Sequence, residues 1–155
     1  MTTRIARGAV IAALYAVVTI ILKPISFGYL QVRVAEALTL LPILFPEAIP
    51  GLFIGCLLSN IYGGLGPIDI VLGSLTTLAA AWLTYAWRQS WLAYLSPIVL
   101  NGLVVGAYLS YLLHVNILLA MGSVALGEAI AVLVLGVPLV KRLQKLSLGQ
   151  SGDTE

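Results

Sequence analysis

VNILLAMGSVALGEAIAVLVLGVPLV, residues Val115–Val140, is the last long apolar stretch of the chain, and its one charged residue is Glu128. The stretch exceeds the roughly 20 residues that a helix needs to cross the hydrocarbon core of a bilayer. A carboxylate at the centre of such a helix costs ~2.5–3.5 kcal/mol on insertion scales, so an ionisable residue at that depth indicates a functional site. The stretch therefore predicts a membrane-spanning helix and a candidate site residue.

The composition of the whole chain places it in the membrane class. Of its 155 residues, 61% are hydrophobic and 9% are charged, and the mean hydropathy is +1.07. A soluble domain carries about 25% charged residues, so this chain has too few charges to cover a globular surface. We predict one transmembrane domain over residues 1–146 and a disordered polar cytoplasmic tail over residues 147–155.

The hydropathy pattern and the positions of proline and glycine divide the chain into six expected transmembrane helices. The expected fold is therefore all-α. Two of the helices are short and bracketed by prolines. Short, proline-interrupted segments of a transporter point to its substrate site, although a re-entrant pair that only packs has the same pattern. The expected helices are Ile5–Leu22, Ala35–Phe45, Glu47–Tyr62, Pro67–Trp87, Ala93–Leu113 and a last one from the turn at His114–Asn116 to about Lys141, with Ile25–Val34 as an extended segment.

The basic residues predict the orientation of these helices. Six crossings bring both chain ends to one side of the membrane, and most basic residues then share that side. Cytoplasmic loops carry the excess of lysine and arginine, so we predict that both termini are cytoplasmic in a multi-pass protein of the cell membrane. The residues on the predicted inner side are Arg4, Arg7, Arg88, Lys141, Arg142 and Lys145, whereas Lys23 and Arg33 lie on the outer side.

Several kinds of chemistry are absent from the sequence. The chain has no G-x-x-x-x-G-K-[ST] phosphate loop, so any ATP-driven work belongs to a partner. One histidine and one cysteine do not make a zinc site, and Cys56 alone makes no internal disulfide. We therefore expect no enzyme activity, no metal and no cofactor.

The remaining polar residues of the membrane segments each have a structural interpretation as well as a functional one. Arg33 and Glu36 are three residues apart and form either an ion pair or part of a site. Asp69 falls in the first turn of a helix, where the helix dipole stabilises a carboxylate. Asn60 suits a helix C-terminus, and Asn101 suits a contact between helices. Glu128 has no such structural explanation and needs a cation, donors, a ligand or a proton.

Small residues recur along the first helix at a spacing of four. In lipid, this spacing lets another helix approach closely. The stripe fits packing against helices of the same chain or a docking face for another membrane subunit. Its residues are Gly8, Ala12 and Ala16 in one row and Ala9 and Ala13 in the next.

Three segments resemble the queuosine-precursor transporter (QueT) family. They are QVRVAEALTLLP (residues 31–42), GLFIGCLLSN (51–60) and GLGPIDIVLGSLTTL (64–78). Asn101 and Gly127–Glu128 fit the same pattern. The resemblance implies a substrate-binding (S) component of an energy-coupling factor transporter. Such a subunit works with a transmembrane coupling subunit and two cytoplasmic ATPases, and the small residues of the first helix would face the coupling subunit.

The resemblance also implies a ligand, a 7-deazaguanine base such as the pre-queuosine base or queuine. One carboxylate can accept the ring N–H and the exocyclic amine together, and a second can face the cationic aminomethyl group. Tyr29, Tyr62 or Trp82 would stack on the base. The implied substrate-binding residues are Arg33, Glu36, Asn60, Tyr62, Asp69, Asn101 and Glu128.

Two alternatives stay open at the level of sequence. The chain could be an S component for another vitamin or a purine-like substrate. It could also be a small oligomeric channel or a structural membrane subunit, in which Glu128 is paired across a homo-oligomer.

Overall fold

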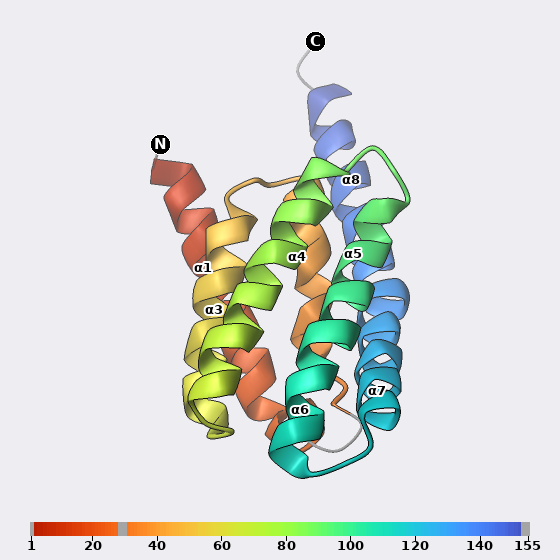
Figure 1. Ribbon diagram of the computed structural model, residues 1–155. Coiled ribbons are helices and arrows are strands. Elements are labelled where there is room, and N and C mark those ends of the chain that lie inside the picture. The colour runs from red at the N-terminus through yellow and green to blue at the C-terminus, as the bar shows by residue number, and fades with distance from the viewer. Residues whose placement is uncertain (1, 28–30, 153–155) are drawn as a thin grey trace.

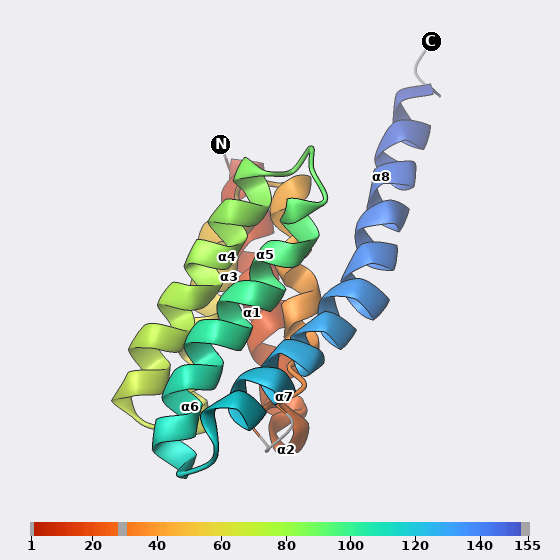
Figure 2. The ribbon, with the colours of Figure 1, turned by 45° about the vertical axis from the view of Figure 1, so that its right-hand side comes forward.

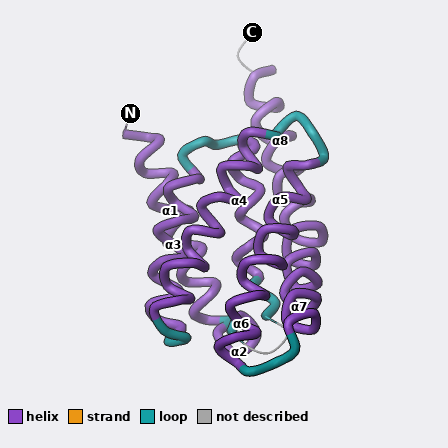
Figure 3. Tube along the Cα trace, in the orientation of Figure 1, coloured by secondary structure: helices purple, strands orange, loops and turns teal. Residues whose placement is uncertain are grey.

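The computed structural model describes residues 2–27 and 31–152, with side chains as far as Leu146. Every regular element in these ranges is helical (Figure 3). Four helices are long and apolar enough to cross a membrane: Thr2–Ile21, Asp69–Ala86, Leu92–Leu113 and Ile117–Leu146. Two shorter apolar helices, Val34–Ile43 and Ala48–Gly63, correspond to the two short segments expected from the sequence, and six crossings stay a prediction.

The elements follow one another with short connections. The list in chain order is α1 (Thr2–Ile21), α2 (Lys23–Ser26), the 3-10 helix η1 (Val34–Ile43), α3 (Ala48–Gly63), η2 (Asp69–Gly73), α4 (Ser74–Ala86), α5 (Leu92–Leu100), η3 (Asn101–Val105), α6 (Gly106–Leu113), α7 (Ile117–Ala129), η4 (Ile130–Gly136) and α8 (Val137–Gly152). The segments η2, η3 and η4 are π-helical stretches inside otherwise continuous helices. Most predicted helix bounds therefore agree with the structure within a few residues.

The segment expected to be extended, Ile25–Val34, differs from the prediction. Ile25 and Ser26 belong to α2, because Pro24 at the start of this short helix already has the φ angle of a helical turn. Residues 31–33 are irregular and form no strand. The backbone of α8 also continues to Gly152, into the segment expected to be a disordered tail.

The helices form a bundle in which η1 lies inside (Figure 1). Both chain ends lie at the same end of the bundle, and α8 extends past it (Figures 1 and 2). At that end, the Arg7 guanidinium forms an ion pair with Glu47 at 2.6 Å. One core cluster joins α1, η1 and α3 through Tyr15, Ala35 and Leu52, all buried.

Close backbone contact joins α1 to α3. A Cβ on Gly51 would lie 2.5 Å from the Gly8 carbonyl oxygen, and one on Gly55 would lie 2.7 Å from the Ala12 carbonyl oxygen. Only glycine permits this approach, so one row of the small-residue stripe packs inside the chain. The other row, Ala9 and Ala13, stays exposed.

Candidate functional site

A small polar cavity lies between η1, η3 and α7. Its volume is about 10 Å³, which is room for at most one water molecule. Its lining residues are Gln31, Arg33, Glu36, Asn101, Val105, Val124 and Glu128. The structure thus brings together four of the predicted site residues from segments far apart in the sequence.

Two buried carboxyl groups line the polar cavity. Glu36 and Glu128 are 2% and 4% exposed, and Arg33 lines the same small space. The Tyr15 hydroxyl donates to Glu36 Oε1. The Asn101 amide donates to Glu128 Oε1 at 2.9 Å. Each acid therefore has one donor, and Glu36 Oε2 has none among the described residues.

Arg33 is a buried cation without a direct ion pair. It is 6% exposed, and its Nη1 donates a weak hydrogen bond to the Cys56 sulfur at 3.7 Å. Its guanidinium carbon lies 5.0 Å from the centre of the Phe27 ring. Within residues 2–27 and 31–146, Arg33 has no carboxylate at ion-pair distance, and its Nη2 has no hydrogen-bond partner. The ion pair of Arg33 with Glu36, one of the two interpretations of their spacing, is thus not formed directly.

A second polar cluster surrounds Gly73 near the start of the long helix Asp69–Ala86. The Tyr108 hydroxyl donates to Asp69 Oδ1 at 2.6 Å, and Asn60 Nδ2 donates to the Asp69 carbonyl oxygen at 3.1 Å. A Cβ on Gly73 would lie 2.9 Å from both Asn60 Nδ2 and the Tyr108 hydroxyl, so glycine is needed there. Asp69 Oδ2 and Asn60 Oδ1 are buried and lack partners in the described part of the chain.

Cys56 connects the two polar groups of residues. Its sulfur accepts from Thr77 at 3.3 Å and from Asn60 at 3.4 Å, in addition to Arg33. The thiol is fully buried. The sulfur therefore accepts hydrogen bonds both from Arg33 of the polar cavity and from Asn60 of the Asp69 cluster.

Irregular helix geometry coincides with the polar residues. Glu36 lies in the 3-10 helix η1, Asp69 and Asn101 begin π-helical segments, and η4 begins two residues after Glu128. Such local changes in helical pitch are frequent at functional sites.

Other candidate residues lie away from the polar cavity. Tyr62 and Trp82 are 58% and 59% exposed, and Lys23 Nζ lies 5.1 Å from the centre of the Tyr62 ring. Tyr29 lies outside the described residues. Neither Tyr62 nor Trp82 stacks over the cavity in this arrangement.

Sequence reasoning missed three contributors to the polar region: Tyr15, Tyr108 and Gln31. Tyr15 and Tyr108 both have the helical spacing of aromatic residues that pack in a core. Their polar role is visible only in the structure, where each buried hydroxyl group donates a hydrogen bond to a carboxylate. Gln31 adopts a left-handed backbone conformation with a φ of 39°, which is unusual for a residue with a side chain. No sequence signal identifies that conformation at a glutamine.

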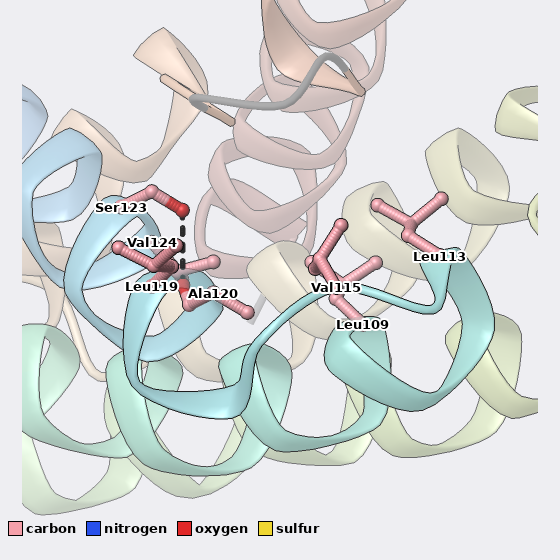
Figure 4. Close-up of a pocket in the computed structure, with 7 residues that line it drawn as sticks. All are labelled: Leu109, Leu113, Val115, Leu119, Ala120, Ser123 and Val124. Carbon is pink, nitrogen blue, oxygen red and sulfur yellow. Dashed lines mark hydrogen bonds between the residues drawn. The ribbon is translucent and has the colours of Figure 1, made fainter.

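An apolar pocket adjoins the polar cavity. We call it the α6–α7 pocket; its volume is about 280 Å³. Leu109, Leu113 and Val115 line it from α6 and the following loop (Figure 4). Leu119, Ala120, Ser123 and Val124 line it from α7. Val124 belongs to both spaces.

A third space is an apolar groove of about 560 Å³ along α1 and α3, which we call the α1–α3 groove. Ala9 and Ala13 line its exposed side, and Gly8 and Ala12 line its floor. Arg4 and Glu47 lie at one end. Gly8 and Ala12 therefore pack inside the chain, the first of the two interpretations made from the sequence. Ala9 and Ala13 face outward, and the docking face stays a prediction.

Metal binding has no candidate site in the part of the chain that the structure describes, where no three His, Cys, Asp or Glu residues gather. The polar cavity instead offers carboxylates, an amide and a guanidinium. These groups can bind an organic ligand that has several N–H donors.

Comparison with known proteins gives a family. A family model described as QueT transporter matches residues 5–145. The queuosine precursor transporter QueT of Lactococcus lactis subsp. cremoris (strain MG1363) is 28% identical over 153 residues, covering 88% of this chain and 89% of that protein. No solved structure matches the chain. Together with its four long apolar helices, the match over nearly the whole chain shows that this multi-pass membrane protein belongs to the QueT transporter family.

Proposed function

We propose that this chain binds and imports a queuosine precursor, a 7-deazaguanine base such as the pre-queuosine base or queuine. The observation that carries the proposal is the set of unpaired buried polar atoms. Of the five such atoms in the described residues, three are acceptors, Glu36 Oε2, Asn60 Oδ1 and Asp69 Oδ2, one is a donor, Arg33 Nη2, and the fifth is the Ser26 hydroxyl oxygen. Glu36 and Arg33 line the polar cavity. Leaving a buried polar atom unpaired costs about 1–3 kcal/mol. A ligand that relieves this cost has several N–H groups and at least one acceptor.

An aminomethyl 7-deazaguanine has this complement. Its ring N–H and exocyclic amine form a bidentate pair with one carboxylate, the strong charge-assisted geometry. Its ammonium group faces the other carboxylate of the Glu36–Glu128 pair. Its ring carbonyl accepts from Arg33, and Asn101 donates to a ring acceptor or accepts from a remaining N–H group. A cation between the two acids also removes their mutual repulsion.

The same proposal requires the polar cavity to enlarge when the ligand binds. At about 10 Å³ the cavity cannot hold a two-ring base. The lining includes the left-handed residue Gln31 and the side chain of Val105, which a base would displace.

For transport, we propose an S component of an energy-coupling factor transporter with six crossings and cytoplasmic termini. The location of both chain ends at one end of the bundle supports an even number of crossings (Figure 1). The sequence has no phosphate loop, so ATP hydrolysis would belong to two partner ATPases. The exposed alanines of the α1–α3 groove offer a surface for the coupling subunit. The loaded subunit would then reorient in the membrane and release its ligand inside, without chemistry on the ligand.

The decisive experiment measures thermal stability of the purified protein in detergent with the pre-queuosine base, queuine, guanine and thiamine. A ligand at 100 times its Kd stabilises a protein by about 2.7 kcal/mol. We expect stabilisation by the first two ligands and less by guanine, which lacks the ammonium group. Stabilisation by thiamine alone would indicate another vitamin as the substrate. A stable homo-oligomer that none of the four ligands stabilises would indicate a channel or structural subunit.

A further inference from the structure

The polar cavity and the α6–α7 pocket share one lining residue, Val124, whose side chain we call the wall. Val124 is 4% exposed and lines both spaces. Val105, which is 5% exposed, lines the polar cavity only. Leu109 lines the α6–α7 pocket only. Figure 4 shows Val124 on α7 beside Leu119, Ala120 and Ser123, at the edge of the pocket.

The backbones on either side of this wall are fixed by close packing. A Cβ on Gly106 would lie 2.5 Å from the Met121 Cα atom, and one on Gly102 would lie 2.9 Å from the Ala125 Cβ atom. The Asn116 side chain caps the start of α7 by accepting from the Leu118 amide at 2.9 Å. Because α7 is held against η3 and α6 at these points, the separation between the polar cavity and the α6–α7 pocket depends on the size of the Val124 side chain. It does not depend on the spacing of the helices.

The room behind the wall differs in chemistry from the polar cavity. It is about 28 times larger by the two volumes, 280 Å³ against 10 Å³, and its lining is aliphatic apart from Ser123. The Ser123 hydroxyl is already bonded to the Ala120 carbonyl oxygen at 3.0 Å. An apolar cavity of about 150 Å³ is enough to bind benzene, so the α6–α7 pocket has room for a phenyl ring.

We propose that Val124 is a specificity-determining residue that limits the size of the substituent on the bound base. The inference rests on the proposed function, because it assumes that the base occupies the enlarged polar cavity. With valine at this position, the base ends at the wall and only a small polar substituent is accepted. With a smaller residue, the two spaces join, and a base with a bulky apolar substituent extends into the α6–α7 pocket.

The test compares two probes by isothermal titration calorimetry on the purified full chain: 7-aminomethyl-7-deazaguanine and its N-benzyl derivative. We expect the unaltered protein to prefer the small probe. One methylene group in an apolar pocket changes discrimination by about 10–200-fold, so Val124→Ala should shift the ratio of affinities toward the benzyl probe by at least about tenfold. Val105→Ala is the matched control, since it removes the same atoms from the polar cavity without opening the pocket, and it should leave the ratio unchanged.

A double variant tests the path that the substituent takes. Ala120→Phe fills the α6–α7 pocket from a position that does not line the polar cavity, so adding it to Val124→Ala should abolish the gain for the benzyl probe. Binding of the small probe shows that each variant is folded. If Val124→Ala does not fold, Val124→Cys should give a smaller gain in the same direction.

The outcomes separate the two proposals. If the unaltered protein binds neither probe, the proposed function fails and the size limit fails with it. If it binds the small probe but Val124→Ala and Val124→Cys leave the ratio unchanged, the size limit alone is overturned. The same holds if Val105→Ala gives an equal gain, or if Ala120→Phe does not remove the gain.

Discussion

Glu128 is tolerated at the centre of a long apolar helix because it is not isolated. The Asn101 amide donates to one of its oxygens, and Glu36 and Arg33 lie within electrostatic reach. Glu128 is 4% exposed, so its carboxyl group has lost most of its contact with water. Among the described residues, the protein does not replace that water with a full set of hydrogen-bond donors. Such a group is stabilised further by a ligand that brings N–H donors or a positive charge.

We predict that Glu128→Gln weakens binding of the aminomethyl base by at least about tenfold, or about 1.4 kcal/mol. The amide loses the charge that the ammonium needs and places an NH₂ group where the ligand presents its own donors. Titration calorimetry on the purified variant measures the change. Glu47→Gln is the control, since Glu47 pairs with Arg7 and does not line the polar cavity. Unchanged affinity in folded Glu128→Gln would remove this residue from the site.

Residue chemistry explains which members of the polar region could be predicted. Glu128, Glu36, Asn101 and Arg33 are conspicuous in the sequence because charged and amide groups are rare in apolar helices. Tyr15 and Tyr108 were missed because an aromatic residue at helical spacing predicts core packing equally well. Whether such a hydroxyl group meets a carboxylate depends on which helices are neighbours, and hydropathy does not contain that information.

At the scale of the elements, length and punctuation predicted the bounds of the long helices within a few residues, except for the end of the last one, which continues from about Lys141 to Gly152. They could not predict the 3-10 geometry of η1 or the π-helical segments. A change of pitch over one or two turns barely alters a hydropathy pattern, whereas it redirects the side chains that follow. Glu36 of the polar cavity lies in η1, and Asn101 and Val105 lie in η3, so these residues were predictable individually but the shape of the cavity was not.

The contact of α1 with α3 gives a prediction about stability. Gly51→Ala should destabilise the protein by about 1–3 kcal/mol, the range for overpacking, because the added methyl group would meet the Gly8 carbonyl oxygen at 2.5 Å. Thermal unfolding in detergent measures the change. Gly122→Ala on α7 is the matched control: a Cβ there has no atom within 4 Å, and alanine favours a helix by about 1 kcal/mol over glycine. Equal stability of the two variants would contradict the close contact.

At the scale of the whole molecule, the polar cavity and the α1–α3 groove are built on different helices. The polar cavity is lined from η1, η3, α7 and the segment before η1, and the groove from α1 and α3 with the turn before α3. Tyr15 connects the two regions, since it lies on α1 and donates to Glu36. A substitution on α1 can therefore disturb the proposed assembly with partner subunits without disturbing ligand binding, provided that the substituted residue faces away from the bundle.

The exposed row of the small-residue stripe provides that separation. Ala9→Leu or Ala13→Leu adds bulk on the outer side of α1. Either change should leave ligand affinity unchanged but reduce uptake several-fold. The reason is that the proposed coupling subunit could no longer approach the α1–α3 groove closely. Affinity is measured on the purified chain, and uptake of the labelled base is measured in cells that also produce the coupling subunit and the ATPases. Ala79→Leu, an exposed alanine on α4 outside the groove, controls for added bulk in the lipid-facing surface. Normal uptake by both α1 variants would exclude the groove as the docking face. Loss of uptake by Ala79→Leu as well would attribute the effect to bulk in the membrane and not to a specific contact.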